Sequence, residues 1–196
     1  MGINLQKGQR ISLKKEAPNL TKLMCGLGWD VNQKKGGWFS RSADFDLDAF
    51  VICVDDQEKL TSKSDIVYFG NLRHSSNAIT HLGDNLTGDG DGDDEQIVVD
   101  LPQIPERIAK LLFLINIYDS QKRKQELSQV DNAFVRLVDL SNNKEIARYK
   151  LSGSQYQNYN GLILGEVYRH EGEWKMAAIG DPFSARNIKE IANKYT

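Results

Sequence analysis

Apolar and polar residues alternate in short runs along much of this chain, a pattern typical of half-buried β-strands. The clearest example covers residues 23–30, where Leu23, Cys25, Leu27 and Trp29 stand at every second position. Alternation of this kind directs one set of side chains to a single face of a strand. Further strands are expected over residues 3–13 (one edge strand or a pair), 46–54, 65–69, 78–81, 96–101, 110–118, 133–140, 145–151, 162–168 and 174–179.

Many short strands separated by turn residues predict an all-β fold, an antiparallel β-sandwich of two sheets. Residues 46–54 become apolar on both faces, as expected of a central strand, and residues 110–118 form the most apolar segment. Ile188 and Ile191, spaced i, i+3 after Ser184, predict a short helix over about residues 184–195. Because the composition does not change along the chain, we expect a single domain over residues 1–196.

Charge and cysteine usage narrow the class of protein. Acidic residues gather in residues 44–48 and 84–95, while the basic clusters are short, so the basic face of a nucleic-acid binder is not predicted. Cys25 and Cys53 stand in apolar runs, which favours buried free thiols over a disulfide. No apolar run has the length of a signal peptide core or a membrane span, so a cytoplasmic location is expected.

Residues 83–95 form the most unusual stretch. Its acidic side chains are Asp84, Asp89, Asp91, Asp93, Asp94 and Glu95, and it contains no basic residue. Like charges about 5 Å apart repel by roughly 0.8 kcal/mol per pair in water, and by more at a protein surface. A folded loop of this composition therefore needs a cation, a basic partner from elsewhere in the fold, or full solvation.

The residue types in this stretch favour Ca²⁺, which takes six to eight oxygen ligands from carboxylates, carbonyls, Asn side chains and water. Glycines alternate with aspartates from Gly88 to Asp93, which lets the backbone curl around one centre. Asp84 and Asn85 lie before this run, and Asp94 follows it with Glu95. His and Cys are absent from the run, which argues against zinc and softer metals.

A second acidic cluster strengthens this interpretation. Asp44, Asp46 and Asp48 alternate, so on an extended chain their carboxylates share one face. Asp30 ends the strand that precedes them. If these segments lie beside residues 83–95 at one pole of the sandwich, about ten acidic residues converge there, and two Ca²⁺ ions are expected rather than one.

Alternatives remain open at this point. Residues 83–95 also suit a solvated loop without a tight ion, and Mg²⁺ is a weaker candidate because it keeps more water. An EF-hand is disfavoured, because Asp94 stands where that loop needs glycine and the flanks are predicted strands. A metal-dependent hydrolase would need His81 or His170 as a base, and no nucleophile motif accompanies them. Ca²⁺-dependent docking to a membrane or a partner is the third alternative.

Several motifs, in order along the chain, resemble the TerD family of tellurium-resistance and stress proteins. They are Gly26-Leu27-Gly28-Trp29-Asp30, Asp44-Phe45-Asp46-Leu47-Asp48-Ala49, Gly83-Asp84-Asn85-Leu86-Thr87-Gly88 through Gly92-Asp93-Asp94-Glu95, Asn132-Ala133-Phe134-Val135-Arg136, and Gly165-Glu166-Val167-Tyr168-Arg169-His170 with Gly172-Glu173-Trp174-Lys175. The resemblance runs from about residue 1 to residue 180.

The resemblance implies a β-sandwich with Ca²⁺ sites at one pole, a cytoplasmic role in tellurite resistance and stress response, and no established catalytic activity. Protein partners in a stress-response complex are also expected, whereas a membrane contact has little support in the sequence. The implied side-chain ligands are Asp30, Asp44, Asp46, Asp84, Asn85, Asp93, Asp94 and Glu95. Backbone ligation is expected near Gly88 and Gly90, and a supporting role for Asp48. The segment at residues 36–41 and the tail after Gly180 depart from the family pattern.

Overall fold

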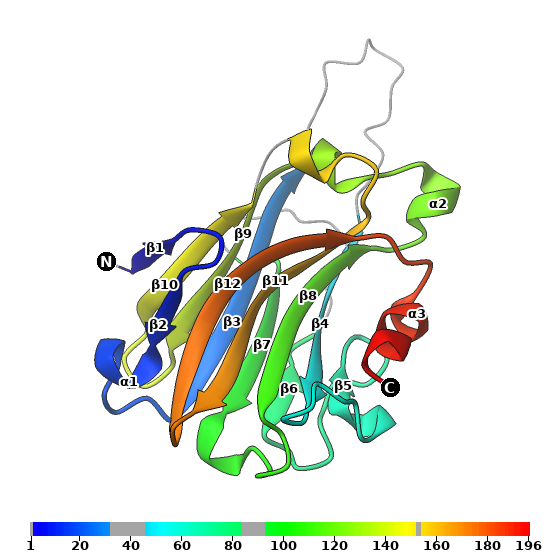
Figure 1. The fold of residues 1–196 in the computed structure, drawn as a ribbon. Coiled ribbons are helices and arrows are strands. Elements are labelled where there is room, and N and C mark those ends of the chain that lie inside the picture. Colours follow the sequence, from blue (N-terminus) through cyan, green and yellow to red (C-terminus); the bar gives the residue numbers. More distant parts are fainter. Residues whose placement is uncertain (1, 32–45, 84–92, 152–153) are drawn as a thin grey trace.

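In the computed structural model, which describes residues 2–31, 46–83, 93–151 and 154–196, two six-stranded β-sheets pack face to face (Figure 1). Sheet A has the strand order β1-β10-β9-β3-β7-β6, and sheet B has the order β2-β12-β11-β8-β4-β5. The predicted β-sandwich is confirmed, and its described strand pairs are antiparallel except that β1 runs parallel to β10.

The strands of sheet A are β1 (Ile3–Leu5), β3 (Lys22–Val31), β6 (Ile79–His81), β7 (Glu95–Asp100), β9 (Val130–Asp139) and β10 (Lys144–Leu151). Those of sheet B are β2 (Arg10–Ser12), β4 (Leu47–Val54), β5 (Ile66–Val67), β8 (Lys110–Ile117), β11 (Gly161–His170) and β12 (Glu173–Phe183). The α-helices are α1 (Leu13–Glu16), α2 (Ser120–Arg123) and α3 (Ile188–Ala192). Short 3-10 turns are η1 (Lys63–Asp65), η2 (Leu101–Gln103), η3 (Leu127–Gln129), η4 (Ser154–Tyr156) and η5 (Asn193–Tyr195).

The two N-terminal strands lie in different sheets, although they are close in sequence. The turn at Lys7 and Gly8 carries the chain from sheet A to sheet B, and Gly8 has a positive φ of 81° that suits glycine. The Gly8 N–H donates to the carbonyl of Ala178 in β12 (2.8 Å). The predicted pair of strands therefore closes one side of the sandwich instead of forming a hairpin.

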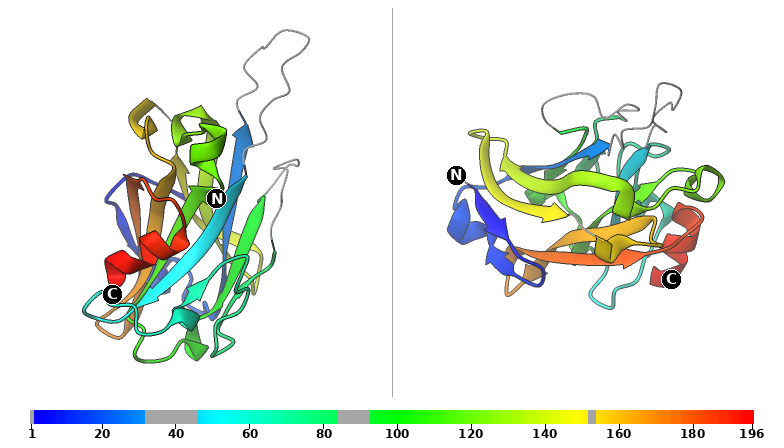
Figure 2. Two further views of the ribbon diagram at one scale, coloured as in Figure 1. Left: turned by 90° about the vertical axis from the view of Figure 1, so that its right-hand side faces the viewer. Right: turned by 90° about the horizontal axis from the view of Figure 1, so that it is seen from above.

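The main core fills the space between the sheets, and a second apolar cluster covers the outer face of sheet B. In β4, Leu47 and Val51 point into the main core, whereas Phe50 and Ile52 point outwards. Helix α3 covers this outer face, and Ile191 packs in the second cluster. Figure 2 shows the two layers from above and α3 beside sheet B. This double burial explains why residues 46–54 are apolar on both faces.

The C-terminal helix is confirmed, although it begins later than Ser184. Asn187 is the N-cap, because its Oδ1 accepts a hydrogen bond from the Glu190 N–H (3.0 Å). The Ser184 hydroxyl instead donates to the carbonyl of Asn158 (3.0 Å). The α-helix thus covers only Ile188–Ala192, and η5 continues it to Tyr195.

Both cysteines are free and buried, as predicted. Burial raises the pKa of the Cys25 thiol well above its ordinary value, and the nearby Asp93 adds to this shift. Burial also raises the pKa of Cys53 strongly. Neither thiol is therefore placed to act as a nucleophile or a metal ligand at neutral pH.

Candidate metal centre at one end of the sandwich

Four chain segments meet at one end of the sandwich: the end of β3, the start of β4, the end of β6 and the start of β7. We call this end the acidic pole and define it by residues 29–30, 46–49, 81–83 and 93–95. The Trp29 N–H donates to Asp94 Oδ2 (2.8 Å), and the Asp94 N–H donates to the Leu27 carbonyl (2.7 Å). These two bonds fasten the start of β7 to the end of β3, where Asp30 lies.

Glu95 links the same junction to β4. Alternation along β7 places Glu95 on the inner face with Ile97 and Val99, so its side chain is only 1% exposed. Its Oε2 accepts a hydrogen bond from the Ala49 N–H, near the start of β4. A buried carboxylate therefore joins sheet A to sheet B at the acidic pole.

His81 completes this junction. The Gly83 N–H donates to His81 Nδ1 (3.1 Å), so the ring proton lies on Nε2 in the neutral imidazole. Nε2 then donates to the Ala49 carbonyl (3.2 Å) and lies 3.6 Å from Glu95 Oε2. These contacts occupy both ring nitrogens, Nδ1 with Gly83 and Nε2 with Ala49, so His81 is not set up as the catalytic base of the hydrolase alternative.

Asp93 lies on the outer face of sheet A and pairs with a basic side chain. Arg136 donates to it twice, from Nε to Oδ1 (2.7 Å) and from Nη2 to Oδ2 (2.9 Å). Since Val135 and Leu137 point into the core, alternation places Arg136 on the outer face. The carboxylate lies over Gly26, where a Cβ would come within 2.2 Å of Asp93 Oδ2. The sequence allowed a basic partner from elsewhere in the fold for residues 83–95, and Arg136 is such a partner for Asp93.

Asp46 lies on the opposite outer face, that of sheet B. It precedes Leu47, which points into the core, so Asp46 and Asp48 share the outward direction that their alternation predicts. The Nη2 of Arg123 lies 3.7 Å from Asp46 Oδ2, and the Asp46 carbonyl accepts a hydrogen bond from the Tyr118 N–H (2.8 Å). The described carboxylates therefore meet at one end of the molecule without converging on a single point.

Several predicted ligands fall outside the description. Asp44, Asp84, Asn85, Gly88 and Gly90 lie outside the described residues, as does the unusual segment at residues 36–41. Asp30 is described only by its backbone, which pairs with Asp131 of β9. Among the described residues, no group of three or more His, Cys, Asp or Glu side chains is arranged to hold a metal ion. The Ca²⁺ site therefore stays a prediction.

A buried polar cluster, which was not predicted from the sequence, surrounds Asp65. The Asp65 and His74 side chains are both fully buried, and His74 Nε2 donates to Asp65 Oδ1 (2.9 Å). Arg107 donates to both carboxylate oxygens of Asp65 (2.7 and 2.8 Å), and Thr61 donates to Oδ2 (2.9 Å). Burial alone would raise the pKa of Asp65, but the bonds from Arg107, His74 and Thr61 lower it below its ordinary value.

This cluster contains a Ser, His and Asp combination, yet its geometry is structural. His74 Nδ1 accepts a hydrogen bond from the Ser76 N–H (3.1 Å) and also contacts the Ser76 hydroxyl (2.7 Å). Ser76 is two residues away in the same turn. The Ser76 oxygen also accepts from the Ala78 N–H (3.2 Å). The hydroxyl thus caps a turn and is not presented to a substrate.

His170, the other base considered for a hydrolase, lies at the end of β11 that is far from the acidic pole. Its Nδ1 is 3.1 Å from the Lys175 ammonium.

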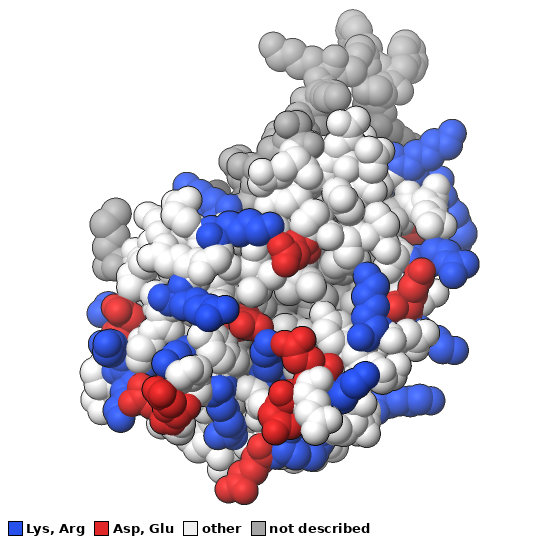
Figure 3. Space-filling view, in the orientation of Figure 1, with Lys and Arg blue, Asp and Glu red and all other residues white. Residues whose placement is uncertain are grey.

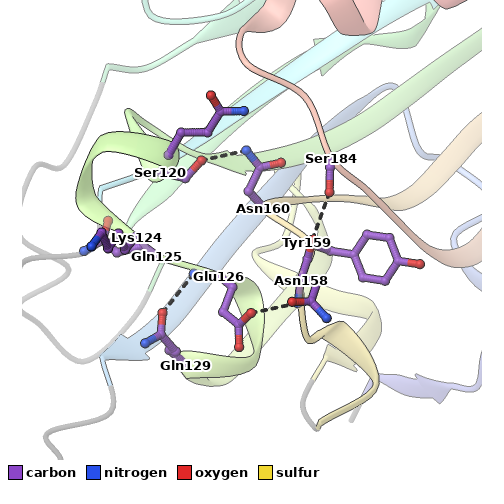
Figure 4. Close-up of a pocket in the computed structure, with 10 residues that line it drawn as sticks. Ser120, Lys124, Gln125, Glu126, Gln129, Asn158, Tyr159, Asn160 and Ser184 are labelled. Carbon is purple, nitrogen blue, oxygen red and sulfur yellow. Dashed lines mark hydrogen bonds between the residues drawn. The ribbon is translucent and has the colours of Figure 1, made fainter.

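A polar hollow of ≈320 Å³ lies next to α2 at the same end of the sandwich (Figure 4). The Asn160 amide donates to Ser120 Oγ (2.6 Å), and the Asn158 N–H donates to the Glu126 carboxylate (2.7 Å). The Ser184 hydroxyl donates to the Asn158 carbonyl. These bonds tie together the segments around α2, before β11 and after β12, so the polar groups in this hollow hold the loops in place.

The fold and the acidic pole together define a class: a β-sandwich domain with a candidate metal centre built from loops at one end. The TerD domain family matches residues 1–195, and the chain belongs to this family.

Full-length relatives support this assignment. The chain is 44% identical over 200 residues to stress response protein SCP2 of Bacillus subtilis (strain 168), with 100% of both chains covered. It is 42% identical to general stress protein 16U of the same organism, covering 100% of this chain and 97% of that protein. It is 40% identical to tellurium resistance protein TerD of Serratia marcescens, with the same coverage of 100% and 97%. None of these names is that of an enzyme.

A solved structure shares the fold. A homologue of telluride resistance protein (TerD) from Streptomyces coelicolor A3(2) superposes with a TM-score of 0.68 at 16% identity, covering 91% of this chain and 99% of that one. Within the described residues, no helix has the length and apolar character needed to cross a membrane. On the face shown in Figure 3, Lys and Arg side chains are interspersed with Asp and Glu rather than gathered in a continuous basic patch.

Proposed function

We propose that this protein is a calcium-binding stress-response protein without catalytic activity, and that it binds two Ca²⁺ ions at the acidic pole in the cytoplasm. The observation that carries the proposal is the junction formed by Asp94 and Glu95. Asp94 bonds to Trp29, the neighbour of Asp30, and Glu95 bonds to Ala49 near the start of β4. The ends of all three acidic segments are therefore fastened together.

The described acids do not suit Ca²⁺ equally well. Asp93 receives two hydrogen bonds from Arg136, and Asp46 lies near Arg123, so their charges are already offset. Asp94 lies at the junction itself, within residues 83–95, which hold most of the predicted ligands. Bound Ca²⁺ would supply the positive charge that offsets the mutual repulsion of the remaining carboxylates. We therefore expect Asp94 to be a ligand and Asp93 chiefly to stabilise the fold.

Calorimetric titration of the purified chain with Ca²⁺ tests this proposal. Asp94→Asn should weaken Ca²⁺ binding by roughly 10-fold or more, because affinity follows the number of charged ligands. Asp93→Asn should mainly lower the free energy of unfolding, by about 1.5–3 kcal/mol, since it weakens a charged hydrogen-bonded pair. Mg²⁺ should bind far more weakly than Ca²⁺.

Asp100→Asn is the matched control, because Asp100 ends β7 at the opposite end from Asp94 and pairs with Lys22 (3.6 Å). It should leave Ca²⁺ binding unchanged. The absence of any heat or thermal shift up to about 1 mM Ca²⁺ would contradict the proposal, since even weak extracellular Ca²⁺ modules bind in that range.

One observation favours Ca²⁺-dependent docking as a second candidate function. Leu82 directly precedes Gly83 and is 59% exposed, so a large apolar side chain lies at the entrance to the acidic segment. Ca²⁺ bound beside it would bridge to anionic groups of a membrane or a protein partner. Co-sedimentation with vesicles containing anionic lipid, with and without chelator, tests the membrane version. Binding that needs Ca²⁺ and weakens in Leu82→Ser would support it, whereas equal sedimentation with chelator would reject it.

A further inference from the structure

A cavity of ≈520 Å³ lies on the outer face of sheet B beside α3, and the proposed Ca²⁺ function does not use it. Its walls come from the segment after β5, the end of β8 and the N-terminal part of α3. This volume is within the range of small-molecule sites, which hold a few polar groups among apolar walls. We call it the α3 cavity and define it by Asp48, Phe69, Asn116, Tyr118, Arg186 and Lys189, which carry the argument.

The floor of the α3 cavity consists of hydrogen-bond acceptors. Asp48 and Asn116 lie directly opposite each other on β4 and β8, and they are only 4% and 8% exposed. The Asn116 carboxamide oxygen Oδ1 is buried and has no hydrogen-bond partner within the described part of the chain. An unmet buried acceptor is unfavourable, so a ligand whose donor reaches this oxygen would be favoured.

One wall of the α3 cavity is aromatic. Phe69 and Tyr118 lie edge to face with their ring centroids 6.3 Å apart, and Tyr68 packs against Phe69 at 5.2 Å. Phe69 and Tyr118 are nevertheless 43% and 44% exposed. The Arg123 guanidinium already lies over the Tyr118 ring (5.8 Å to its centroid), so a ligand cation would lie chiefly against Phe69. Aromatic faces beside acceptor groups are the surroundings that attract organic cations such as ammonium and guanidinium groups.

The opposite rim carries positive charge. Arg186 lies 3.2 Å from Glu190, which offsets part of its charge, whereas Lys189 makes no such pair within the described residues. Like charges at this rim disfavour a ligand that is cationic throughout, such as a polyamine. They favour one whose far end is an anion, such as a carboxylate.

We propose that the α3 cavity binds a basic amino acid, either free or at the carboxyl terminus of a peptide. Its cationic head group lies chiefly against Phe69 and donates to Asp48 and Asn116. Its carboxylate faces Arg186 and Lys189. This assignment does not rest on Ca²⁺ binding: the cavity shares Asp48 with the acidic pole, but it includes none of the residues predicted as metal ligands.

Calorimetric titration of the full chain with L-arginine, and with a short peptide ending in arginine, tests the proposal. Both should bind saturably, whereas agmatine, which lacks the carboxylate, should bind several-fold more weakly. Phe69→Ala should weaken L-arginine binding by roughly 5- to 30-fold, the size expected for a partly desolvated cation–π contact. Lys189→Gln should weaken L-arginine binding but should not weaken agmatine binding, because agmatine has no carboxylate to pair with Lys189 and is repelled by its charge.

Two matched variants separate this effect from general damage. Leu72→Ala also shortens an exposed apolar side chain after β5 (45% exposed), but outside the cavity, so binding should not change. Lys150→Gln removes a surface charge from sheet A and should likewise have no effect. The proposal is overturned if L-arginine and the peptide show no saturable binding up to about 10 mM, or if Phe69→Ala and Leu72→Ala behave alike. If agmatine bound as tightly as L-arginine, the proposed contact between the ligand carboxylate and Arg186 and Lys189 would be wrong.

Discussion

At the scale of single residues, three consecutive acids have three different surroundings. Asp93 turns to Arg136 on the outer face of sheet A, and Asp94 accepts a bond from the Trp29 N–H. Glu95 points inwards and bonds to Ala49. Alternation begins only at Glu95, where β7 starts. A continuous strand would put Asp93 on the same face as Glu95, so the backbone before β7 departs from strand geometry, which lets Asp93 face outwards and Glu95 inwards. Residues that look equivalent in the sequence therefore have different chemical roles.

The Asp65 cluster makes stability depend on pH. The pKa of Asp65 in the folded protein lies below its ordinary value of 3.8, because Arg107, His74 and Thr61 outweigh the effect of burial. The unfolded chain therefore takes up this proton first as pH falls. The stabilising contribution is complete above about pH 4 and is lost as pH falls through the folded-state pKa. Denaturant unfolding measured between about pH 7 and pH 3 should show this loss.

Asp65→Asn removes the charge at almost constant shape and should cost roughly 2–4 kcal/mol at pH 7, because it leaves Arg107 and His74 without their acid. The variant should also show a smaller fall in stability below about pH 4 than the unchanged protein. Asp181→Asn is the control, since Asp181 is exposed and its pair with Lys7 (2.7 Å) lies at the surface. An Asp65→Asn variant as stable as Asp181→Asn would contradict this account.

At the scale of elements, β4 and β8 organise sheet B because they are buried on both faces. Their inner residues join the core between the sheets, and their outer residues meet α3. Helix α3 has only five residues, too few to be stable alone, so packing on the sheet must hold it in place. One short helix thus provides both the cover of the second apolar cluster and one wall of the α3 cavity.

Ile191→Ala tests this dependence. Ile191 is 2% exposed and packs in the second cluster, so truncation should cost about 2–4 kcal/mol in the free energy of unfolding. Lys194→Ala, near the same end of the chain, is the control and should change stability by about 1 kcal/mol or less, because it removes only an exposed cation–π contact with the Phe183 ring (5.4 Å). Denaturant melts of both variants decide the point, and equal stabilities would show that α3 does not cover the sheet in solution.

At the scale of the whole molecule, the fold was predictable because its signal is local. Period-two alternation along residues 23–30 and double-sided burial of residues 46–54 are both visible in the sequence, and both strands formed. One edge strand or a pair was expected over residues 3–13, but the sequence does not show which sheet each of the two strands joins. That choice depends on pairing with β10 and β12, far away in the chain.

The candidate site was less predictable, because its chemistry depends on partners distant in sequence. The acids of residues 83–95 are conspicuous, but nothing near them indicates that Arg136 pairs with Asp93 or that Glu95 turns inwards. Asp65 and Arg107 stand 42 positions apart and follow no spacing rule, so the buried cluster was missed. The sequence therefore showed that acidic residues gather in residues 83–95, but not which carboxylates pair with an arginine and which bond to the backbone.

The central claim is that the acidic pole holds Ca²⁺. The most direct test is the metal content of the full chain, purified without chelator, equilibrated with Ca²⁺ and analysed by native mass spectrometry alongside elemental analysis. We predict about two Ca²⁺ ions per chain, retained when Mg²⁺ is present in excess and lost on treatment with chelator. A chain that carries no Ca²⁺ under these conditions would contradict the claim.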